Sequence, residues 1–172
     1  MIERLQSPTV LMIVPAHMEH LAGAKRLADC FKRELGFINR ATLQKAIETQ
    51  QVLVALCQSA QDEQGDGACR EGTALVGMVH FYVRRDQIIT LYNIVVAQAY
   101  QRRGFGRQLF EALVNVAETL GTRQIRLKCP VDLSANLFYE YLGMEHVEVE
   151  PGKRRPLNIW TYTLQDGVRA SD

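Results

Sequence analysis

The segment from residue 88 to residue 129 constrains the fold most, because it predicts a strand, a glycine turn, a helix and a second strand in succession. Residues 88–96 are almost continuously apolar and β-branched, and residues 109–120 carry apolar side chains at helical spacing. Residues 124–129 alternate as a strand. Because a helix connects the two strands, they must run parallel, with a right-handed crossover. We therefore expect a cleft at their carboxyl ends.

The turn between this strand and this helix has the chemistry of an anion site. Gly104 and Gly106 let the backbone approach a ligand, and the new helix supplies unpaired N–H groups and the positive end of its dipole. Arg102, Arg103 and Arg107 oppose that dipole by roughly 0.3–1 kcal/mol each unless an anion is bound. These features favour a pyrophosphate cradle.

Other interpretations of the turn are open or excluded. Gly-x-Gly precedes many helices, so a tight turn with solvated arginines is the alternative to a cradle. A dinucleotide fingerprint does not fit, because Leu109 occupies the place of its third glycine, and the chain has no Gly-x4-Gly-Lys-Ser/Thr phosphate loop.

Patterns along the rest of the chain predict a single domain with its core at about residues 9–164. Gly36, Gly121 and Gly143 are expected to end helices. The polar insert at residues 59–73 is expected to be a mobile loop without chemistry, and residues 165–172 a tail. The predicted strands outside the central segment are 9–14, 52–57, 74–83, 144–150 and 157–164, and the predicted helices are 21–35, 41–49 and 134–142.

Composition limits the partners of this chain. Its 172 residues, 47% hydrophobic and 23% charged, suit one ordinary globular domain, and a formal charge of +1 gives no overall attraction to nucleic acid or to an anionic membrane. The four cysteines, Cys30, Cys57, Cys69 and Cys129, lack the spacing of a zinc site, so no metal is expected and reduced thiols are favoured. The apolar run at residue 10 is too short to span a membrane, and a cytoplasmic location is the default.

Two segments and the element order resemble the GCN5-related N-acetyltransferase (GNAT) superfamily. Residues 101–106 match its Arg/Gln-x-x-Gly-x-Gly/Ala signature, and residues 134–144 look like its Asn-x-x-x-Tyr-x-x-x-Gly-Phe segment, with Met144 in place of the aromatic residue. The resemblance implies a mixed α/β (α+β) fold, with a mainly antiparallel sheet, a central parallel strand pair and flanking helices. It also implies an acetyl-CoA-dependent N-acetyltransferase that moves a short acyl group to the primary amine of a small molecule or peptide, directly within a ternary complex.

By the same resemblance, the end of the strand at residues 94–96 holds the pantetheine arm of coenzyme A, and the glycine turn holds the pyrophosphate. Asn136 is expected to bond the pantetheine or a phosphate, with plain helix-surface polarity as the alternative. The expected cofactor-binding residues are Ile94, Val95, Val96, Gln101, Arg102, Arg103, Gly104, Phe105, Gly106, Arg107 and Asn136.

The resemblance assigns Tyr139 the role of general acid, which protonates the departing thiolate. Helical spacing places Leu137 and Tyr141 on one apolar stripe with Leu133, Phe138 and Leu142, and Tyr139 off that stripe. A phenol there can supply the proton that a thiol of pKa near 8.5 requires. The alternative is an aromatic ring that fills a gap between helix and sheet, and Tyr141 is expected in the core.

The general base is left open. Some relatives place Glu eleven residues before the signature, where this chain has Thr90. His17, Glu19, His80 and Tyr92 are the candidates, and Tyr92 is expected to share a strand face with Thr90 and Ile94. Cys129 is an alternative nucleophile, although direct transfer needs none.

Two other functions stay open beside the enzyme. One is a non-catalytic module that binds acyl-CoA, for which Thr90 would mark lost base chemistry. The other is a nucleic-acid-binding domain that uses Arg102, Arg103 and residues 153–155, against which the nearly neutral charge argues. The oligomeric state is also open, a homodimer included.

Overall fold

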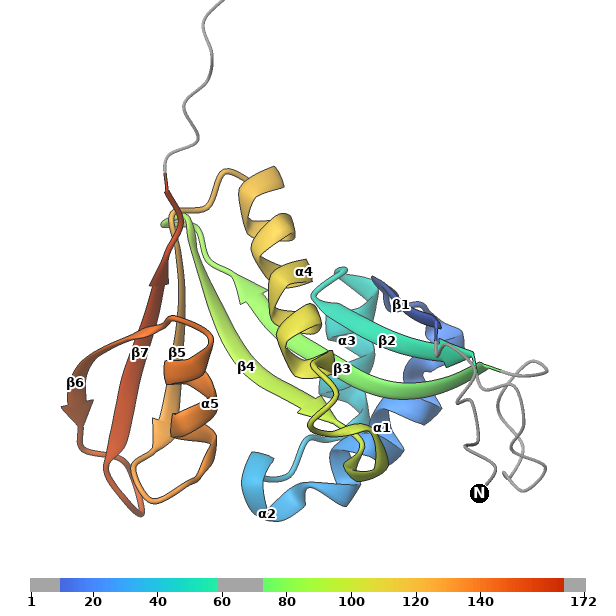
Figure 1. Ribbon diagram of the computed structural model, residues 1–172, viewed down its shortest axis with the longest axis horizontal. Coiled ribbons are helices and arrows are strands. Elements are labelled where there is room, and N and C mark those ends of the chain that lie inside the picture. Colours follow the sequence, from blue (N-terminus) through green and yellow to red (C-terminus); the bar gives the residue numbers. More distant parts are fainter. Residues whose placement is uncertain (1–9, 59–72, 166–172) are drawn as a thin grey trace, which may run out of the picture.

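The computed structural model describes residues 10–58 and 73–165. They form a seven-stranded sheet in the order β1-β2-β3-β4-β5-β7-β6, in which β4 and β5 are parallel and every other pair is antiparallel (Figure 1). The expected mixed sheet with a central parallel pair is confirmed. The strands are β1 (Val10–Pro15), β2 (Val52–Gln58), β3 (Thr73–Val83), β4 (Ile88–Val96), β5 (Gln124–Pro130), β6 (Glu145–Glu150) and β7 (Leu157–Thr163). The expected loop at 59–73, apart from Thr73, and the tail after Gln165 lie outside the described residues.

Helices cover both faces of the sheet (Figure 1). The long helix α4 (Phe105–Thr119) packs Leu109, Phe110 and Leu113 into the core on one face, with strand residues such as Ile125. On the other face, α1 (Leu21–Cys30) and α3 (Arg40–Glu48) form a second core with β2 and β3. A short helix α5 (Ala135–Tyr141) follows β5.

The first predicted helix, residues 21–35, is broken, and the prediction of one continuous helix was wrong. Phe31 leaves helical geometry at φ −114° and ψ 28°, so α1 ends at Cys30 and a separate turn, α2 (Lys32–Leu35), begins after it. Gly36 closes α2 at φ 76°, as expected. The apolar spacing runs through both helices because Phe31 and Leu35 still pack against the same core.

The parallel strands separate soon after they meet. Their pairing covers only three residues of each strand, Ile88–Thr90 against Gln124–Arg126. Below this point in Figure 1 the two strands diverge, and α2 lies near the open end. Among the described residues, no helix is long and apolar enough to cross a membrane.

Candidate functional site

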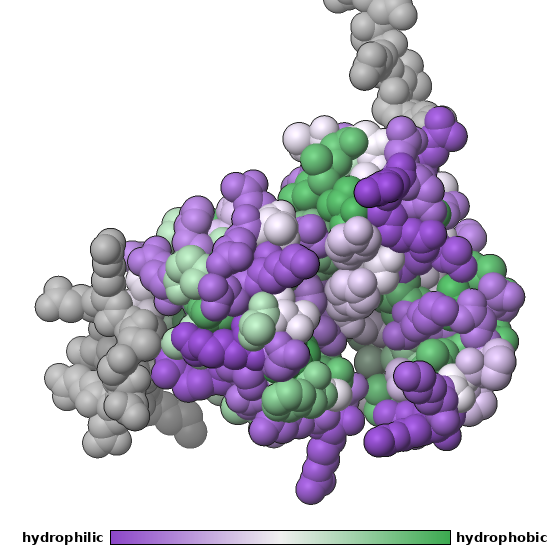
Figure 2. All heavy atoms as spheres, turned by 180° about the vertical axis from the view of Figure 1, so that it is seen from behind, coloured by the Kyte–Doolittle hydropathy of each residue, from purple (hydrophilic) through white to green (hydrophobic). Residues whose placement is uncertain are grey.

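A cleft of about 1110 Å³ lies where β4 and β5 separate. Its walls come from α2, the end of β4, the turn before α4, the end of β5, α5 and the β6–β7 turn. Seen from behind in Figure 2, the surface is hollowed in its lower half, with many hydrophilic residues around the opening. The cleft expected from the sequence is therefore present at the carboxyl ends of the parallel strands.

The glycine turn forms one wall of this cleft. Gly104 has φ 82°, and an added Cβ would meet nothing within 4 Å. The first bond of α4 is donated by Gln108 N–H to Gly104 O, so the amides between them have no carbonyl one turn earlier to bond. Gln101 supports the turn by donating from Nε2 to Val96 O at 3.0 Å. The wall thus offers space and free N–H donors together.

Eight of the eleven residues expected to bind the cofactor line the cleft. These are Ile94, Val95, Val96, Gln101, Arg102, Gly104, Gly106 and Arg107. The other three side chains have neighbours elsewhere. Arg103 lies over the Tyr100 ring at 5.5 Å, and Phe105 is only 7% exposed and stacks on the same ring at 6.2 Å.

Asn136 serves as a connection within the protein. Its Nδ2 donates to Pro130 O and Leu133 O, both at 2.8 Å. Its Oδ1 accepts from Asn158 Nδ2 at 3.0 Å and Trp160 Nε1 at 2.9 Å. The residue lies outside the described set that lines the cleft. Its amide ties the start of α5 to β5 and β7, and so fixes the helix that carries Tyr139.

The two glycines of the turn have different neighbours. A Cβ on Gly106 would meet Phe138 Cζ at 3.0 Å, closer than nearly all Cβ contacts. The absence of a side chain at Gly106 therefore lets α5 pack closely on the first turn of α4. The open space over Gly104 instead lies free for a ligand.

Tyr139 lies in the wall of the cleft and packs beside Phe138 and Trp160, with ring centroids 5.9 Å and 6.4 Å away. Burial, with a smaller contribution from the neighbouring Cys129, raises the pKa of the Tyr139 phenol above its ordinary value. The hydroxyl is therefore protonated at neutral pH and able to donate.

The expected orientation of α5 was wrong in part. Leu137 and Tyr141, predicted to face the core, are 70% and 67% exposed and line the cleft. Leu133 and Leu142 pack against the core as expected, but Tyr139, expected off the stripe, packs there as well. The sequence predicts Ser134 as the cap of this helix, but its side chain makes no capping hydrogen bond. Apolar spacing cannot distinguish a core from the wall of an open cleft, so Leu137 and Tyr141 were assigned to the wrong surface.

Cys129 is the last residue but one of β5, lies beside Tyr139 and is 3% exposed. Its thiol donates a hydrogen bond to Pro130 O, with Sγ 3.6 Å from that oxygen. Burial raises the pKa of the Cys129 thiol to about 11, so the thiol is neutral and a poor nucleophile at neutral pH.

The candidate bases are distributed unevenly. Tyr92 lines the cleft, whereas His17, Glu19 and His80 lie outside its described lining. A bulge shifts the β3–β4 register between His80 and Phe81. On β4, the residues before the bulge that face the α4 core are Ile89 and Leu91. After the bulge, Ile94 and Val96 face that same core. Tyr92 and Thr90 therefore do not share the face of Ile94, contrary to the expectation.

His80 is 7% exposed, contacts the Tyr92 ring at 5.1 Å and has a buried Nδ1 with no hydrogen-bond partner among the described residues. Burial lowers the pKa of this imidazole, so it is neutral near pH 7.

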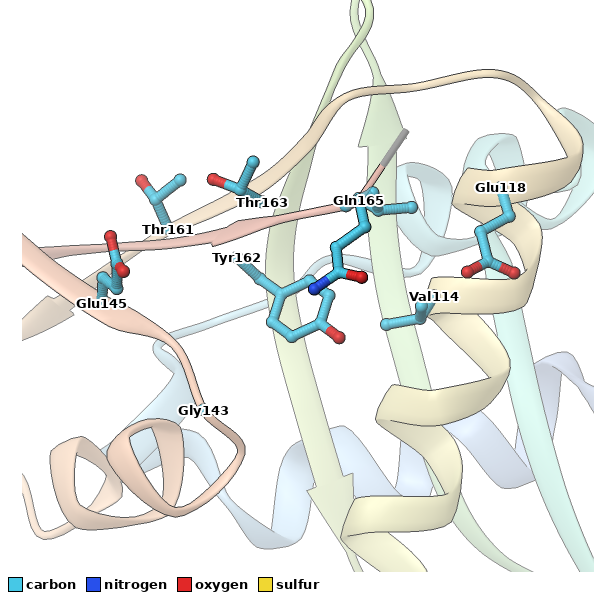
Figure 3. A pocket seen from close by; sticks show the side chains of 9 residues that line it. Val114, Glu118, Gly143, Glu145, Thr161, Tyr162, Thr163 and Gln165 are labelled. Carbon is cyan, nitrogen blue, oxygen red and sulfur yellow. The ribbon is translucent and has the colours of Figure 1, made fainter. Parts of the chain in front are cut away.

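A second, smaller hollow of about 350 Å³ lies away from the glycine turn, between the later turns of α4 and β7 (Figure 3). Figure 3 shows Tyr162 on the side of β7 toward α4, with Thr161 and Thr163 on the other side. The Tyr162 ring packs edge-on against Phe110 at 5.3 Å. The described lining of this smaller hollow contains none of the residues expected to bind the cofactor. The larger cleft is therefore the candidate active site.

The sequence model of the acetyltransferase (GNAT) family matches residues 26–144. The chain belongs to this family. The matched region includes the glycine turn, the separating strands and Tyr139, so the GNAT motifs and the cleft coincide. The comparison with curated protein sequences gives no match.

Solved GNAT structures share the fold at low sequence identity. Ard1 from Thermoplasma volcanium has a TM-score of 0.73 at 15% identity, over 91% of this chain and 99% of that one. The ribosomal-protein-S18-alanine N-acetyltransferase from Escherichia coli has a TM-score of 0.67 at 19% identity, over 95% of this chain and 99% of that one. N-acetylglutamate synthase from Neisseria gonorrhoeae, complexed with coenzyme A and N-acetyl-glutamate, has 0.70 at 15%, over 91% of this chain and 35% of that one.

Proposed function

We propose that this protein is an acetyl-CoA-dependent N-acetyltransferase that moves an acetyl or other short acyl group directly to a primary amine, with Tyr139 as general acid. The observation that carries the proposal is the position of a protonated, mostly buried phenol in the wall of a cleft that also contains the glycine turn. Membership of the GNAT family supports the same reaction class.

The residues present fit coenzyme A. The turn offers amide donors and open space over Gly104. Arg102 and Arg107 lie beside it, and Arg107 Nε is 2.9 Å from Glu111 Oε1. We propose that these groups bind the pyrophosphate, while the end of β4 at Ile94–Val96 holds the pantetheine arm. The arm's thioester supplies the acyl group and a thiolate leaving group. N–H groups at the strand end would stabilise the negative charge that develops on the acyl oxygen.

Tyr139 then provides the proton that the departing sulfur needs. As the amine nitrogen bonds to the acyl carbon, the carbon–sulfur bond breaks, and the phenol donates its proton to sulfur. Transfer from a positioned acid is worth typically 10²–10⁴-fold in rate. The amine proton leaves to water or to a cleft residue, and a proton returns from solvent to the Tyr139 phenolate. Among the bases suggested by the sequence, Tyr92 lines the cleft. The protonated Cys129 thiol argues against an acyl-enzyme intermediate.

The experiment is a turnover assay with acetyl-CoA and a panel of amines, which measures released thiol and acetylated amine together. Amine-dependent release, with initial-rate lines that intersect when both substrates vary, is the expected result. Cofactor binding without amine-dependent release from any amine would instead favour the second candidate, a non-catalytic acyl-CoA-binding module. That candidate is kept because Thr90 stands where some relatives have Glu.

A further inference from the structure

Charge around the cleft is strongly one-sided. Glu34 is the one acidic residue in its described lining. Two of the basic residues, Arg102 and Arg107, belong to the glycine turn. The others are Lys32, Arg33, Lys128, Arg154 and Arg155. This concentration stands out in a chain whose formal charge is only +1.

Some of these five basic residues outside the glycine turn lie on the opposite side of the sheet from that turn. Phe31 and Leu35, which flank Lys32 and Arg33, pack against the core of α1 and α3, whereas α4 packs on the other face. Strand alternation places Lys128 on the α2 side as well, because its neighbours Leu127 and Cys129 face the α4 core. Phosphates held at the turn therefore do not account for these charges.

Three of the five have an acidic partner within the protein, although the partner of Lys32 also pairs with Lys25. Lys128 pairs with Glu150, Arg155 Nη1 lies 2.6 Å from Asp132 Oδ2, and Lys32 Nζ lies 3.8 Å from Asp29 Oδ1. Arg33 and Arg154 have no acidic partner within residues 10–58 and 73–165.

These two arginines come from separate walls. Arg33 lies on α2 and Arg154 lies in the turn between β6 and β7, and both line the cleft. A planar guanidinium binds a carboxylate or a phosphate through two parallel hydrogen bonds, and the phosphates of the donor are already assigned to the glycine turn.

We propose that the acceptor amine carries a carboxylate, which Arg33 and Arg154 bind at the mouth of the cleft. The inference rests on the proposed acetyl transfer and adds the class of acceptor to it. A free amino acid and a peptide with an acidic residue near its amino end present the same chemistry. The donor enters at the glycine turn, and the anionic acceptor enters from the side of α2.

The experiment compares acceptors in pairs that differ only by carboxylate and carboxamide. One pair is a free amino acid and its amide, and the other is a short peptide with Glu or Gln as its second residue. We expect kcat/KM to favour the carboxylate in at least one pair by about tenfold, the low end for hydrogen bonds to charged groups. The pair that shows the preference identifies the source of the carboxylate, and 0.5 M salt should reduce the preference.

Variants then test the two arginines. The double variant Arg33→Gln/Arg154→Gln should bring the carboxylate-to-carboxamide ratio close to one. Lys153→Gln is the matched control, because it removes a charge from the same turn outside the described cleft lining, and it should keep the ratio. Equal use of both members of each pair by the wild type, or an unchanged ratio in the double variant, overturns the acceptor assignment while leaving acetyl transfer intact. No thiol release with any amine overturns both.

Discussion

Gly106 offers a quantitative test of how α5 is positioned against α4. Replacement by Ala has two opposing effects on stability. In the first turn of α4, Ala should gain about 0.5–1 kcal/mol over Gly through helix propensity. Its Cβ would also meet Phe138 Cζ at 3.0 Å, where carbon atoms normally approach to about 3.5–4.0 Å. The ring must therefore retreat by a few tenths of an ångström, and overpacking of this kind costs about 1–3 kcal/mol.

The Phe138→Leu background separates these effects, because Leu lacks the distal ring atoms that the new Cβ would meet. Gly106→Ala should stabilise that variant by about 0.5–1 kcal/mol but should be neutral or destabilising in the wild type. The expected coupling between the two positions is therefore about 1–3 kcal/mol. Gly104→Ala is the control: nothing lies within 4 Å of its Cβ, so its left-handed strain of about 1–2 kcal/mol should be the same in both backgrounds.

Urea unfolding of the wild type, the single variants and the double variants measures this coupling. In thermal melts, each kcal/mol corresponds to about 2–4 °C for a domain of this size. An equal effect of Gly106→Ala with and without the Phe138 ring would refute the close packing of α5 on α4.

Three further predictions concern the cleft and its surroundings. Because the Cys129 thiol is neutral, Cys129→Ala should keep activity within about threefold of wild type. Wild-type protein incubated with acetyl-CoA and no amine should carry no stable acetyl group by mass spectrometry. An acetyl adduct that disappears in Cys129→Ala would contradict direct transfer. Coenzyme A at about one hundred times its Kd should raise the Tm by about 5–11 °C, and Gly104→Asp should abolish that rise through its bulk and charge; a folded variant with the full rise would contradict the cradle. Because burial lowers the pKa of His80, the unfolded chain binds the extra proton first, so the free energy of unfolding should fall below about pH 6.5 by up to about 1.4 kcal/mol per pH unit. His80→Gln should flatten this part of the profile, and an identical slope would show that another group is responsible.

The central parallel pair was predictable because its signals are local. The apolar runs, the glycine turn and the helical spacing of α4 lie within about forty consecutive residues, and a helical connection leaves only one strand direction. The predicted strand at residues 88–96 coincides with β4, and the GNAT family resemblance is confirmed. By contrast, the break at Phe31 changes one residue's backbone angles while the apolar spacing continues.

The residues that line the cleft were harder to predict from the sequence, because its walls come from segments far apart in the chain. Asn136 finds two of its partners at Asn158 and Trp160, more than twenty residues away, which helix spacing cannot show. Leu137 and Tyr141 look like core residues in the sequence because an apolar cleft wall has the same spacing. The basic run at 153–155 was visible, but its proximity to the cleft depends on the fold of the closing hairpin.

The most direct test of the central claim is the replacement Tyr139→Phe, which keeps the ring and removes the proton donor. We expect kcat to fall by about 10²–10⁴-fold while the Kd for coenzyme A stays within about threefold. Tyr162→Phe, in the smaller hollow, is the matched control and should retain full turnover. Turnover of Tyr139→Phe within about threefold of wild type would contradict the account, because the phenol would then serve only as packing and another donor would protonate the thiolate.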